Sequence, residues 1–128
     1  MPRIDPPVPP RAEPFWDATR RCELVAQRCD DCDRFVWYPR EACPGCLSAD
    51  LDWAPLAGTG TIYSFNVMRK PGNPMMRDEV PYVVALVDLD EGIRMTTNIV
   101  GAIDGSLRCD QQVRVDWSVE LSDGRHLP

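Results

Sequence analysis

Apolar and polar residues alternate in several short stretches of the second half of the chain. A period of two places every other side chain on the same face of a strand, so this alternation predicts half-buried β-strands. The strand candidates are residues 59–69, 82–89, 93–100 and 111–120. Segments rich in Pro, Gly, Asn and Asp separate them, as is typical of turns. Regularly spaced short strands with such turns predict a small all-β barrel or sandwich beyond Pro55.

The beginning of the chain shows no such alternation. Residues 1–14 contain six prolines and almost no bulky apolar side chains, which predicts an extended arm with polyproline character. Pro14 suits the first turn of a helix, and residues 15–22 can form about two helical turns with Phe15 and Trp16 on one side. A helix this short is not stable by itself. Its aromatic pair must therefore pack either on the core of this domain or on another chain.

Two β-prone pieces, residues 24–28 and 34–38, each lie next to a pair of cysteines and predict two small hairpins. Each cysteine pair has the spacing Cys-x-x-Cys, and ten residues separate the two pairs. A tight turn of this kind places two thiolates on the same side, and four sulfurs complete the tetrahedral cage of a rubredoxin-like or zinc-ribbon site. The expected metal ligands are Cys29, Cys32, Cys43 and Cys46.

This ligand set predicts one structural zinc ion. Four thiolates leave no open coordination position for a substrate, and the metal supplies stability that a segment of about 35 residues cannot obtain from a hydrophobic core. Iron fits the same ligands, so the choice between the two metals stays open. The alternative, two independent redox motifs, requires a Cys-x-x-Cys at the start of a long helix, whereas Pro44 and Gly45 favour a turn.

The length and the net charge of the chain exclude several classes of function. The chain has 128 residues, enough for one compact domain or for one small domain with an appended module. Its formal net charge is -6, and a surface this acidic is unsuited to nucleic-acid phosphates or anionic membranes. No apolar run approaches the roughly 20 residues of a membrane-spanning helix, and residues 1–14 lack the apolar core of a secretory signal. The sequence therefore predicts a soluble protein of the reducing cytoplasm, without disulfides.

Few residues offer catalytic chemistry. The single histidine, His126, lies in a tail that we expect to be mobile. Lys70 lies in a predicted loop, where a solvated ammonium group is expected. Cys22 and Cys109 fall outside the metal spacing and are expected to be small buried apolar residues. The segment 58–60 lacks the third glycine of a dinucleotide-binding motif and predicts the turn that enters the barrel. The chain is not expected to be catalytic alone.

Six short motifs remain, and each is weak by itself except for the cysteines. They are PFW (14–16), LVAQRC (24–29), YPR (38–40), CPGC (43–46), GTGTIYS (58–64) and VPYVVALV (80–87). Together they resemble the acyl-CoA-associated zinc-ribbon/OB-fold family, also called the domain-of-unknown-function 35 family, and the resemblance covers almost everything after residue 13. It implies a mainly β fold in three parts. These are a proline-rich arm with a short N-terminal helix over residues 1–22, a rubredoxin-like zinc ribbon over 23–56 and an OB-fold β-barrel over 57–128.

Two features depart from the family pattern. An OB-fold barrel has five strands, whereas only four are evident beyond Pro55. We therefore expect a short fifth strand within residues 102–108 or a split of the long 59–69 segment. In addition, residues 108–112 lack the glycine that this family commonly has before its last strand.

Members of the resembled family look like partners of thiolase-fold enzymes that act on acyl-CoA, including thiolases and the aldolases that shorten steroid side chains. The resemblance therefore implies a non-catalytic accessory subunit of such an enzyme, which stabilises its partner and helps to bind the CoA thioester. It points toward steroid side-chain degradation without identifying the substrate. Three alternatives stay open: a nucleic-acid-binding ribbon and OB module, a small electron-transfer protein with iron in the cysteine cage, and a free-standing enzyme.

Two further groups of residues are candidates under this interpretation. Large aromatic residues and arginine dominate the energy of many protein interfaces, so we expect a contact with the partner subunit at Phe15, Trp16, Trp37, Tyr38 and Arg40. Basic residues cluster beside two methionines in the segment after residue 68 of this otherwise acidic chain. The candidates for binding CoA phosphates are Arg69, Lys70 and Arg77. A solvated loop without a ligand is the alternative for this second group.

Overall fold

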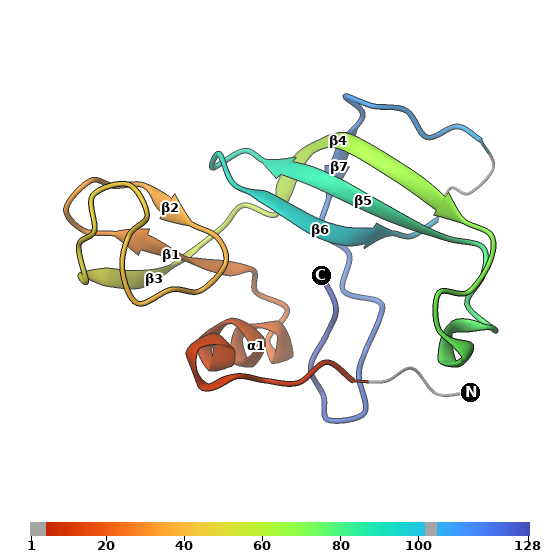
Figure 1. Cartoon of the computed structure of the whole chain (residues 1–128), viewed down its shortest axis with the longest axis horizontal. Coiled ribbons are helices and arrows are strands. Elements are labelled where there is room, and N and C mark those ends of the chain that lie inside the picture. The colour runs from red at the N-terminus through yellow and green to blue at the C-terminus, as the bar shows by residue number, and fades with distance from the viewer. Residues whose placement is uncertain (1–4, 102–104) are drawn as a thin grey trace.

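The computed structural model describes residues 5–101 and 105–128. A small and a larger antiparallel sheet lie next to each other, and one short helix lies beside the small sheet (Figure 1). In chain order the elements of the described residues are η1 (Pro10–Ala12), α1 (Glu13–Arg20), β1 (Val25–Cys29), β2 (Phe35–Val36), β3 (Leu51–Pro55), β4 (Thr59–Met68), η2 (Pro74–Met76), β5 (Tyr82–Leu89), β6 (Arg94–Ile99) and β7 (Gln112–Arg114).

The predicted N-terminal helix is confirmed, although it begins and ends slightly earlier than expected. Pro14 lies in its first turn, where a missing N–H removes no helical hydrogen bond. One face of α1 is buried, through Phe15, Ala18 and Thr19. Phe15 is 8% exposed and belongs to the main hydrophobic cluster. Of the two alternatives for this side chain, the structure therefore shows packing on the chain's own core.

The small sheet has the order β2-β1-β3. The expectation of two hairpins is wrong in one respect. Strands β1 and β2 form the first hairpin, but the strand that follows the second cysteine pair, β3, pairs with β1 instead of forming a second hairpin. Strand β3 pairs with β1 over its whole length, with Gln27 opposite Trp53. Its sequence, LDWAP, combines Asp and Pro with few β-formers, so its strand structure depends on this non-local pairing.

The larger sheet has the order β6-β5-β4-β7. Its strands β4, β5 and β6 confirm three of the predicted strands, and no end differs from its predicted position by more than one residue. Alternation is clearest in β5, where Val83, Ala85, Val87 and Leu89 are buried and the residues between them are half-buried. The inner face of this curled sheet forms much of the hydrophobic core, as expected for the core side of an OB-fold barrel.

Strand β7 is shorter than predicted. It pairs with β4 only from Gln112 to Arg114, although the prediction extended over residues 111–120. Beyond Arg114 the chain leaves the ladder, but every second side chain remains less exposed than its neighbours. These inward-facing residues are Val115, Trp117 and Val119.

No separate fifth strand appears in the part of the larger sheet that the structure describes. Strand β4 stays continuous, but its register with β5 shifts between Ile62 and Ser64, which leaves Tyr63 52% exposed at a bulge. Of the segment 102–108, residues 102–104 lie outside the described residues and residues 105–108 form no strand. The described sheet therefore has four strands.

Two glycines shape the entry into β4, as predicted for the segment 58–60. Gly58 has a φ of +79°, in the left-handed region that favours glycine. At Gly60 a Cβ atom would lie 2.4 Å from the backbone oxygen of Asp88. The backbones of β4 and β5 can therefore approach this closely only because residue 60 has no side chain.

One hydrophobic cluster joins all parts of the fold. It includes Phe15 from α1, Leu24 and Ala26 from the region of β1, and Val87 and Met95 from the larger sheet. A second, smaller cluster surrounds the cysteines. Among the described residues, the one α-helix is too short and too polar to cross a bilayer.

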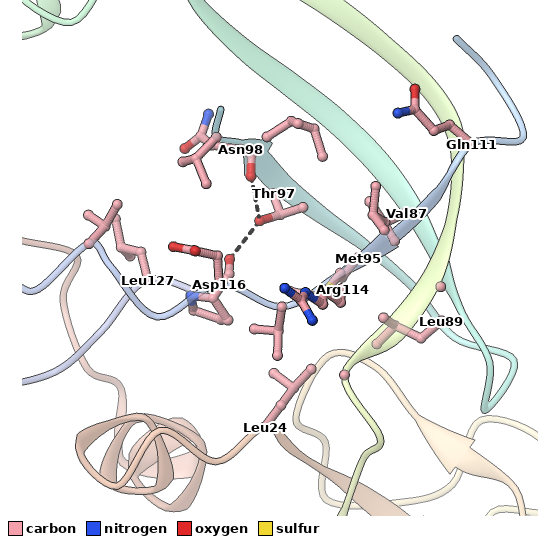
Figure 2. Close-up of a pocket in the computed structure, with 18 of the residues that line it drawn as sticks. Leu24, Val87, Leu89, Met95, Thr97, Asn98, Gln111, Arg114, Asp116 and Leu127 are labelled. Carbon is pink, nitrogen blue, oxygen red and sulfur yellow. Dashed lines mark hydrogen bonds between the residues drawn. The ribbon is translucent and has the colours of Figure 1, made fainter. Parts of the chain in front are cut away.

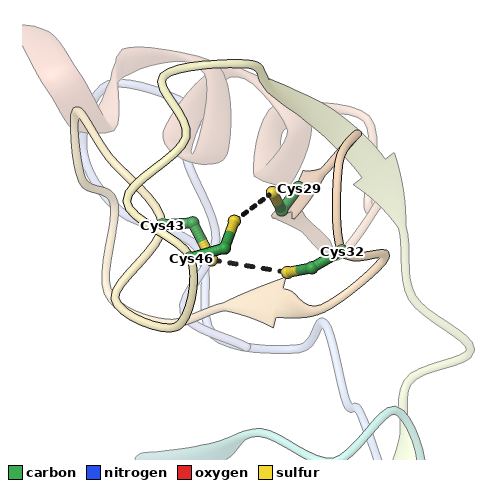
Figure 3. A group of neighbouring side chains, drawn as sticks. All are labelled: Cys29, Cys32, Cys43 and Cys46. Carbon is green, nitrogen blue, oxygen red and sulfur yellow. Dashed lines mark hydrogen bonds between the residues drawn. The ribbon is translucent and has the colours of Figure 1, made fainter.

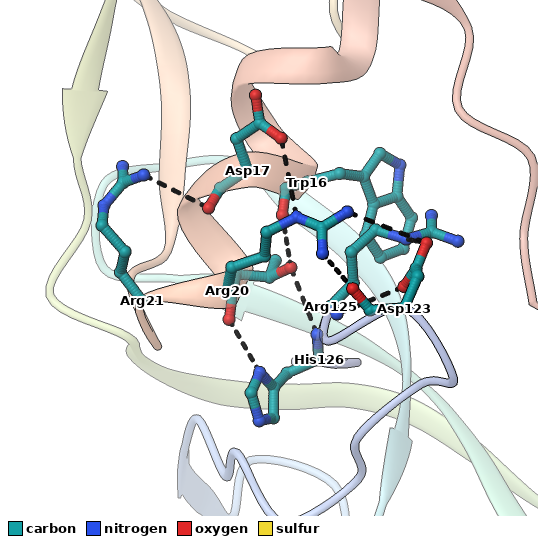
Figure 4. A network of polar contacts seen from close by, with 8 residues as sticks. Trp16, Asp17, Arg20, Arg21, Asp123, Arg125 and His126 are labelled. Atoms are coloured by element: carbon teal, nitrogen blue, oxygen red, sulfur yellow. Dashed lines mark hydrogen bonds and ion pairs between the residues drawn. The ribbon is translucent and has the colours of Figure 1, made fainter.

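The C-terminal turn is fastened to α1 (Figure 4). Arg125 Nε donates to the carboxylate of Asp123 at 2.7 Å, and the Arg20 guanidinium lies 3.8 Å from the same carboxylate. The backbone N–H of His126 donates to Thr19 Oγ1 at 3.2 Å. His126 Nδ1 lies 2.9 Å from the Thr19 carbonyl oxygen, which can only accept, so Nδ1 carries the proton. The expectation of a mobile tail around His126 is therefore wrong.

Candidate functional site

The four cysteines of the Cys-x-x-Cys pairs converge at one end of the small sheet (Figure 3). Their Sγ atoms all lie within 4.8 Å of one another. Cys29 and Cys46 approach to 3.5 Å, and Cys32 and Cys43 to 3.6 Å. A tetrahedral zinc ion with Zn–S bonds of about 2.3 Å requires sulfur separations of about 3.8 Å. The cage therefore has the donor atoms and nearly the dimensions that a zinc ion requires.

The two cysteine turns repeat the same backbone hydrogen bonds. The N–H of Cys29 donates to the carbonyl oxygen of Arg34, and that of Asp33 donates to the carbonyl of Cys29. In the second turn, Cys43 donates to Ser48 and Leu47 donates to Cys43. The fourth residue after the first cysteine has a positive φ in both turns, 61° at Asp33 and 63° at Leu47. This shared geometry places both sulfurs of each pair on the same side.

The protein environment shifts the pKa values of the cysteine thiols in opposite directions. Backbone N–H groups of Cys46 and Gly45 point toward the sulfur of Cys43, and they lower the pKa of that thiol to about 6 despite its burial. For Cys46, the N–H of Ser48 favours the thiolate, but a hydrogen bond shared with Cys29 and the partial desolvation of the sulfur outweigh it and raise the pKa of Cys46 to about 12. Four thiolates this close repel one another, so their joint ionisation requires a cation in the cage.

The surface beside the cage is acidic. Asp30 hydrogen-bonds with Asp52, and together with burial and the charges of Asp52, Asp50 and Asp31 this raises the pKa of Asp30. Such a cluster repels phosphate groups. The charge around the ribbon therefore argues against the nucleic-acid-binding alternative.

A second feature is a groove of about 1050 Å³, called here the aromatic groove. Its walls come from the proline-rich arm, α1, the chain after β2, strand β6 and the end of the chain. The lining residues are Pro9, Pro10, Arg11, Ala12, Phe15, Trp16, Gln27, Trp37, Tyr38, Pro39, Glu41, Met95, Thr96, Thr97, Asn98, Leu127 and Pro128. Ring contacts connect Phe15 with Trp16 at 5.1 Å and with Trp37 at 5.5 Å between centroids.

Four of the five predicted partner-contact residues line this groove. Phe15 forms its buried floor, Trp16 and Trp37 are half-buried, and Tyr38 is 57% exposed. Arg40, the fifth, is exposed beside the groove. The structure therefore brings these residues together on one surface, although Phe15 contributes mainly to the core.

A buried glutamine that the sequence argument did not single out holds this surface in place. Gln27 is 7% exposed, and its amide accepts from the backbone N–H of Arg40 at 2.7 Å and donates to the carbonyl of Arg40 at 3.0 Å. Both bonds fix the segment that carries Tyr38. A polar residue at an inward position of β1 was the signal that could have indicated such a role.

The candidate CoA-binding residues Arg69, Lys70 and Arg77 are exposed in the connection between β4 and β5, on either side of η2. This connection lies at the end of the molecule opposite the small sheet (Figure 1). None of the three residues lines the aromatic groove. The structure therefore places this cluster apart from both the cage and the groove.

The prediction for the two remaining cysteines is wrong. Cys22 and Cys109 are both exposed rather than buried. Cys22 follows α1 with a φ of 54°, a left-handed conformation that ends the helix at the surface. Cys109 lies in a turn before β7.

Comparisons with known proteins agree with this architecture. Residues 16–52 match the family described as "ChsH2, rubredoxin-like zinc ribbon domain", and residues 53–118 match "ChsH2, C-terminal OB-fold domain". The solved structure of an "Ltp2-ChsH2(DUF35) aldolase" contains a chain with 37% identity and a TM-score of 0.86, with 97% of this chain and 95% of that chain covered. The cysteine cage is thus part of a zinc-ribbon domain.

Two further relatives are named as subunits of larger enzymes. A "Benzoylsuccinyl-CoA thiolase subunit BbsA" from Geobacter metallireducens is 30% identical over 82% of this chain and 68% of its own length. A "Probable enoyl-CoA hydratase alpha subunit" from Thermomonospora curvata is 42% identical over 84% of this chain. The chain spans only 33% of the length of that second protein.

Proposed function

Because this chain belongs to the ChsH2 family of zinc-ribbon and OB-fold proteins, we propose that it is a non-catalytic accessory subunit of a thiolase-fold enzyme acting on acyl-CoA. The observation that carries the proposal is the similarity over nearly the whole chain to one chain of an aldolase assembly, at a TM-score of 0.86. The named thiolase subunit BbsA gives independent support. A retro-aldolase or a thiolase is therefore the proposed partner, and steroid side-chain degradation is the proposed setting.

The relative named as a hydratase subunit supports a weaker statement. It aligns with this chain over a third of its own length, so its hydratase activity does not transfer to the present residues. The chemistry of this chain agrees with an accessory role, because its single histidine donates through Nδ1 to the backbone of α1 and stacks edge-on with Trp117. The proposed partner supplies the catalytic groups.

Zinc is the proposed occupant of the cage formed by Cys29, Cys32, Cys43 and Cys46. When bound, the ion supplies charge neutralisation and folding free energy rather than a reactive position. The cysteine turns hold the sulfurs, and the backbone N–H groups next to Cys43 stabilise its thiolate. Free thiols must stay reduced to bind the ion, so a reducing compartment such as the cytoplasm is the proposed location.

The proposed contact with the partner subunit is the aromatic groove together with the exposed faces of Tyr38 and Arg40. Tyr38 is the most exposed aromatic side chain among the described residues, and Gln27 fixes the backbone that carries it. Rigid, exposed aromatic side chains lose little conformational entropy on binding and often anchor interfaces. The Arg69, Lys70 and Arg77 cluster is the proposed contact for CoA phosphates, because its three cations are solvent-accessible in an otherwise acidic chain.

Co-expression with the thiolase-like enzymes of the same genome, followed by size-exclusion chromatography with light scattering, tests the main proposal. We expect a stable hetero-oligomer and an enzyme that is less soluble or less active without this chain. Tyr38→Ala should weaken the complex by about tenfold or more. Tyr63→Ala is the matched control, since Tyr63 is 52% exposed on the larger sheet and lies outside the groove. A chain that stays separate from every such enzyme contradicts the proposal.

A further inference from the structure

We propose that the barrel half of the chain binds an uncharged hydrocarbon with one hydroxyl or carbonyl group inside a cavity of its own. The cavity, called here the barrel cavity, measures about 350 Å³ and lies between the larger sheet and the chain that follows β7 (Figure 2). The proposal goes beyond the accessory role above, because it concerns this chain alone and requires no partner.

Apolar side chains line the barrel cavity from two sides. Strands β5 and β6 contribute Val87, Leu89, Met95 and Ile99 from the inner face of the sheet. The opposite wall comes from β7 and the irregular chain after it, through Val113, Val115, Val119 and Leu127. In Figure 2, Val87, Met95 and Leu89 on one side and Leu24 and Leu127 on the other surround a common space.

The barrel cavity is a pocket that is open to solvent on one side. Asn98, Arg114 and Asp116 at its edge are exposed, whereas Val87, Leu89 and Met95 on its inner wall are buried. Apolar cavities of about 150 Å³ remain dry and take up small hydrocarbons, and ligand pockets begin at about 300 Å³. After Arg114 the chain no longer pairs with β4, but every second side chain still faces inward. Val115 and Val119 therefore face this space and are only half-buried. A hydrocarbon in the cavity would cover the apolar side chains that remain partly exposed where the chain after Arg114 no longer pairs with β4.

The polar groups at the cavity define the rest of the ligand. The Thr97 hydroxyl donates to the carbonyl of Pro128 at 2.6 Å, and the Asn98 amide donates to the carbonyl of Val83 at 3.0 Å, so both groups already have partners. Gln111 accepts from the backbone N–H of Arg108 through Oε1 at 3.2 Å. Its NH2 group makes no hydrogen bond within residues 5–101 and 105–128 and is available to donate to a ligand oxygen.

Charges at the same cavity disfavour an ionised ligand. Arg114 and Asp116 both line it, and their opposite charges provide no field of one sign for a carboxylate or an ammonium group. A net charge of -6 further disfavours anions. An alcohol or ketone with an alkyl or ring body therefore fits this cavity better than a fatty acid.

The experiment uses the full chain, with methyl groups of valine and leucine labelled for NMR, and titrates it with decanol. We expect saturable shifts at Val87, Val115 and Val119. The methyl groups of Leu47, which is 79% exposed outside the cavity, should not respond. Decanoate should bind more weakly than decanol. Shifts of equal size at Leu47, no saturation, or equal binding of decanoate and decanol would overturn the proposal.

A pair of substitutions makes the site assignment specific. Val119→Phe fills the cavity and should weaken decanol binding about tenfold or more. Val84→Phe is the matched control, because Val84 lies on the opposite face of β5, and its binding should equal that of the unmodified chain. If Val119→Phe loses its dispersed methyl spectrum, Val119→Leu, which adds one methylene group, takes its place and should weaken binding by a smaller factor. Unchanged binding in the folded cavity variant overturns the proposal.

Discussion

Arg125 lies over Trp16, with its guanidinium carbon 4.9 Å from the centre of the indole ring. The two residues come from opposite ends of the chain, and Arg125 is only 3% exposed. Its Nε donates to Asp123, whereas its buried Nη1 has no hydrogen-bond partner among the described residues. The aromatic face of Trp16 therefore supplies part of the favourable environment for this buried cation. Because Trp16 lines the aromatic groove, the C-terminal turn helps to position one wall of the proposed partner contact.

Replacing this cation should destabilise the fold. We expect Arg125→Ala to lower the free energy of unfolding by about 2 kcal/mol, because the stacking on Trp16 and the bond to Asp123 are both lost. Urea denaturation followed by Trp fluorescence measures the change. Arg108→Ala, at an exposed position, is the control and should change stability by less than about 0.5 kcal/mol. Equal effects of the two substitutions would refute the role given to Arg125.

The close approach of β4 and β5 predicts a glycine requirement. Gly60→Ala places a Cβ atom 2.4 Å from the Asp88 backbone oxygen, so the strands must separate and stability should fall by about 1–3 kcal/mol. Gly72→Ala is the matched control, since no heavy atom lies within 4 Å of its added Cβ. Thermal melts of both variants provide the comparison. A melting temperature for Gly60→Ala as high as that of the control is incompatible with this packing.

Metal removal should unfold the small sheet. Freshly purified protein should contain one zinc ion per chain, because the four sulfurs form one closed cage. Cys43→Ser should abolish stoichiometric zinc and reduce soluble yield, since structural zinc contributes on the order of 10 kcal/mol in small finger peptides. Cys109→Ser keeps the cage intact and should retain the metal. Metal analysis by mass spectrometry distinguishes these outcomes, and iron in place of zinc would revive the electron-transfer alternative.

Acid should weaken two ion pairs, Asp88 with Arg94 and Asp123 with Arg125. The hydrogen bond from Arg94 lowers the pKa of Asp88, with its charge adding to the effect, and burial opposes it only in part. For Asp123, burial acts to raise the pKa, but bonds and charge from Arg125 and charge from Arg20 lower it overall. A lowered carboxyl pKa contributes stability that is present above the unfolded value of about 3.8 and is lost as pH falls through the folded value.

The test for the Asp88–Arg94 pair compares Asp88→Asn with the unmodified chain in urea, once near neutral pH and once in acid. The variant should be less stable at neutral pH, and the difference should shrink as the pH falls below about 3.8. A difference that stays constant over this range would show that the Asp88 carboxylate contributes no pH-dependent stability.

The sequence predictions that the structure confirms rest on patterns among residues close together in the chain. The alternation in β5 and the spacing of the cysteines are short-range signals, and the structure contains both the strand and the clustered sulfurs. Strand β3 was not predicted because its residues become a strand only by pairing with β1. The expected length of β7 was wrong because alternation fixes which side chains face inward but not whether a neighbouring strand is present.

Contacts between distant segments could not be predicted from the sequence. The bonds between Gln27 and the Arg40 backbone, and the stacking of Arg125 on Trp16, depend on how the helix, ribbon and barrel meet. Cys22 shows a different limit. Cysteine is buried in most proteins, but here a helix ends at this residue with a positive φ, and the chain geometry places the thiol at the surface.

The hydrophobic cluster that joins Phe15, Leu24 and Val87 has a consequence for how the molecule meets other proteins. Helix, ribbon and barrel share this cluster, so they do not move independently of one another. Their relative orientation is set before any encounter, and the entropy of ordering them is lost during folding rather than during association. A partner therefore meets a preorganised surface, for which fast docking with little rearrangement is expected.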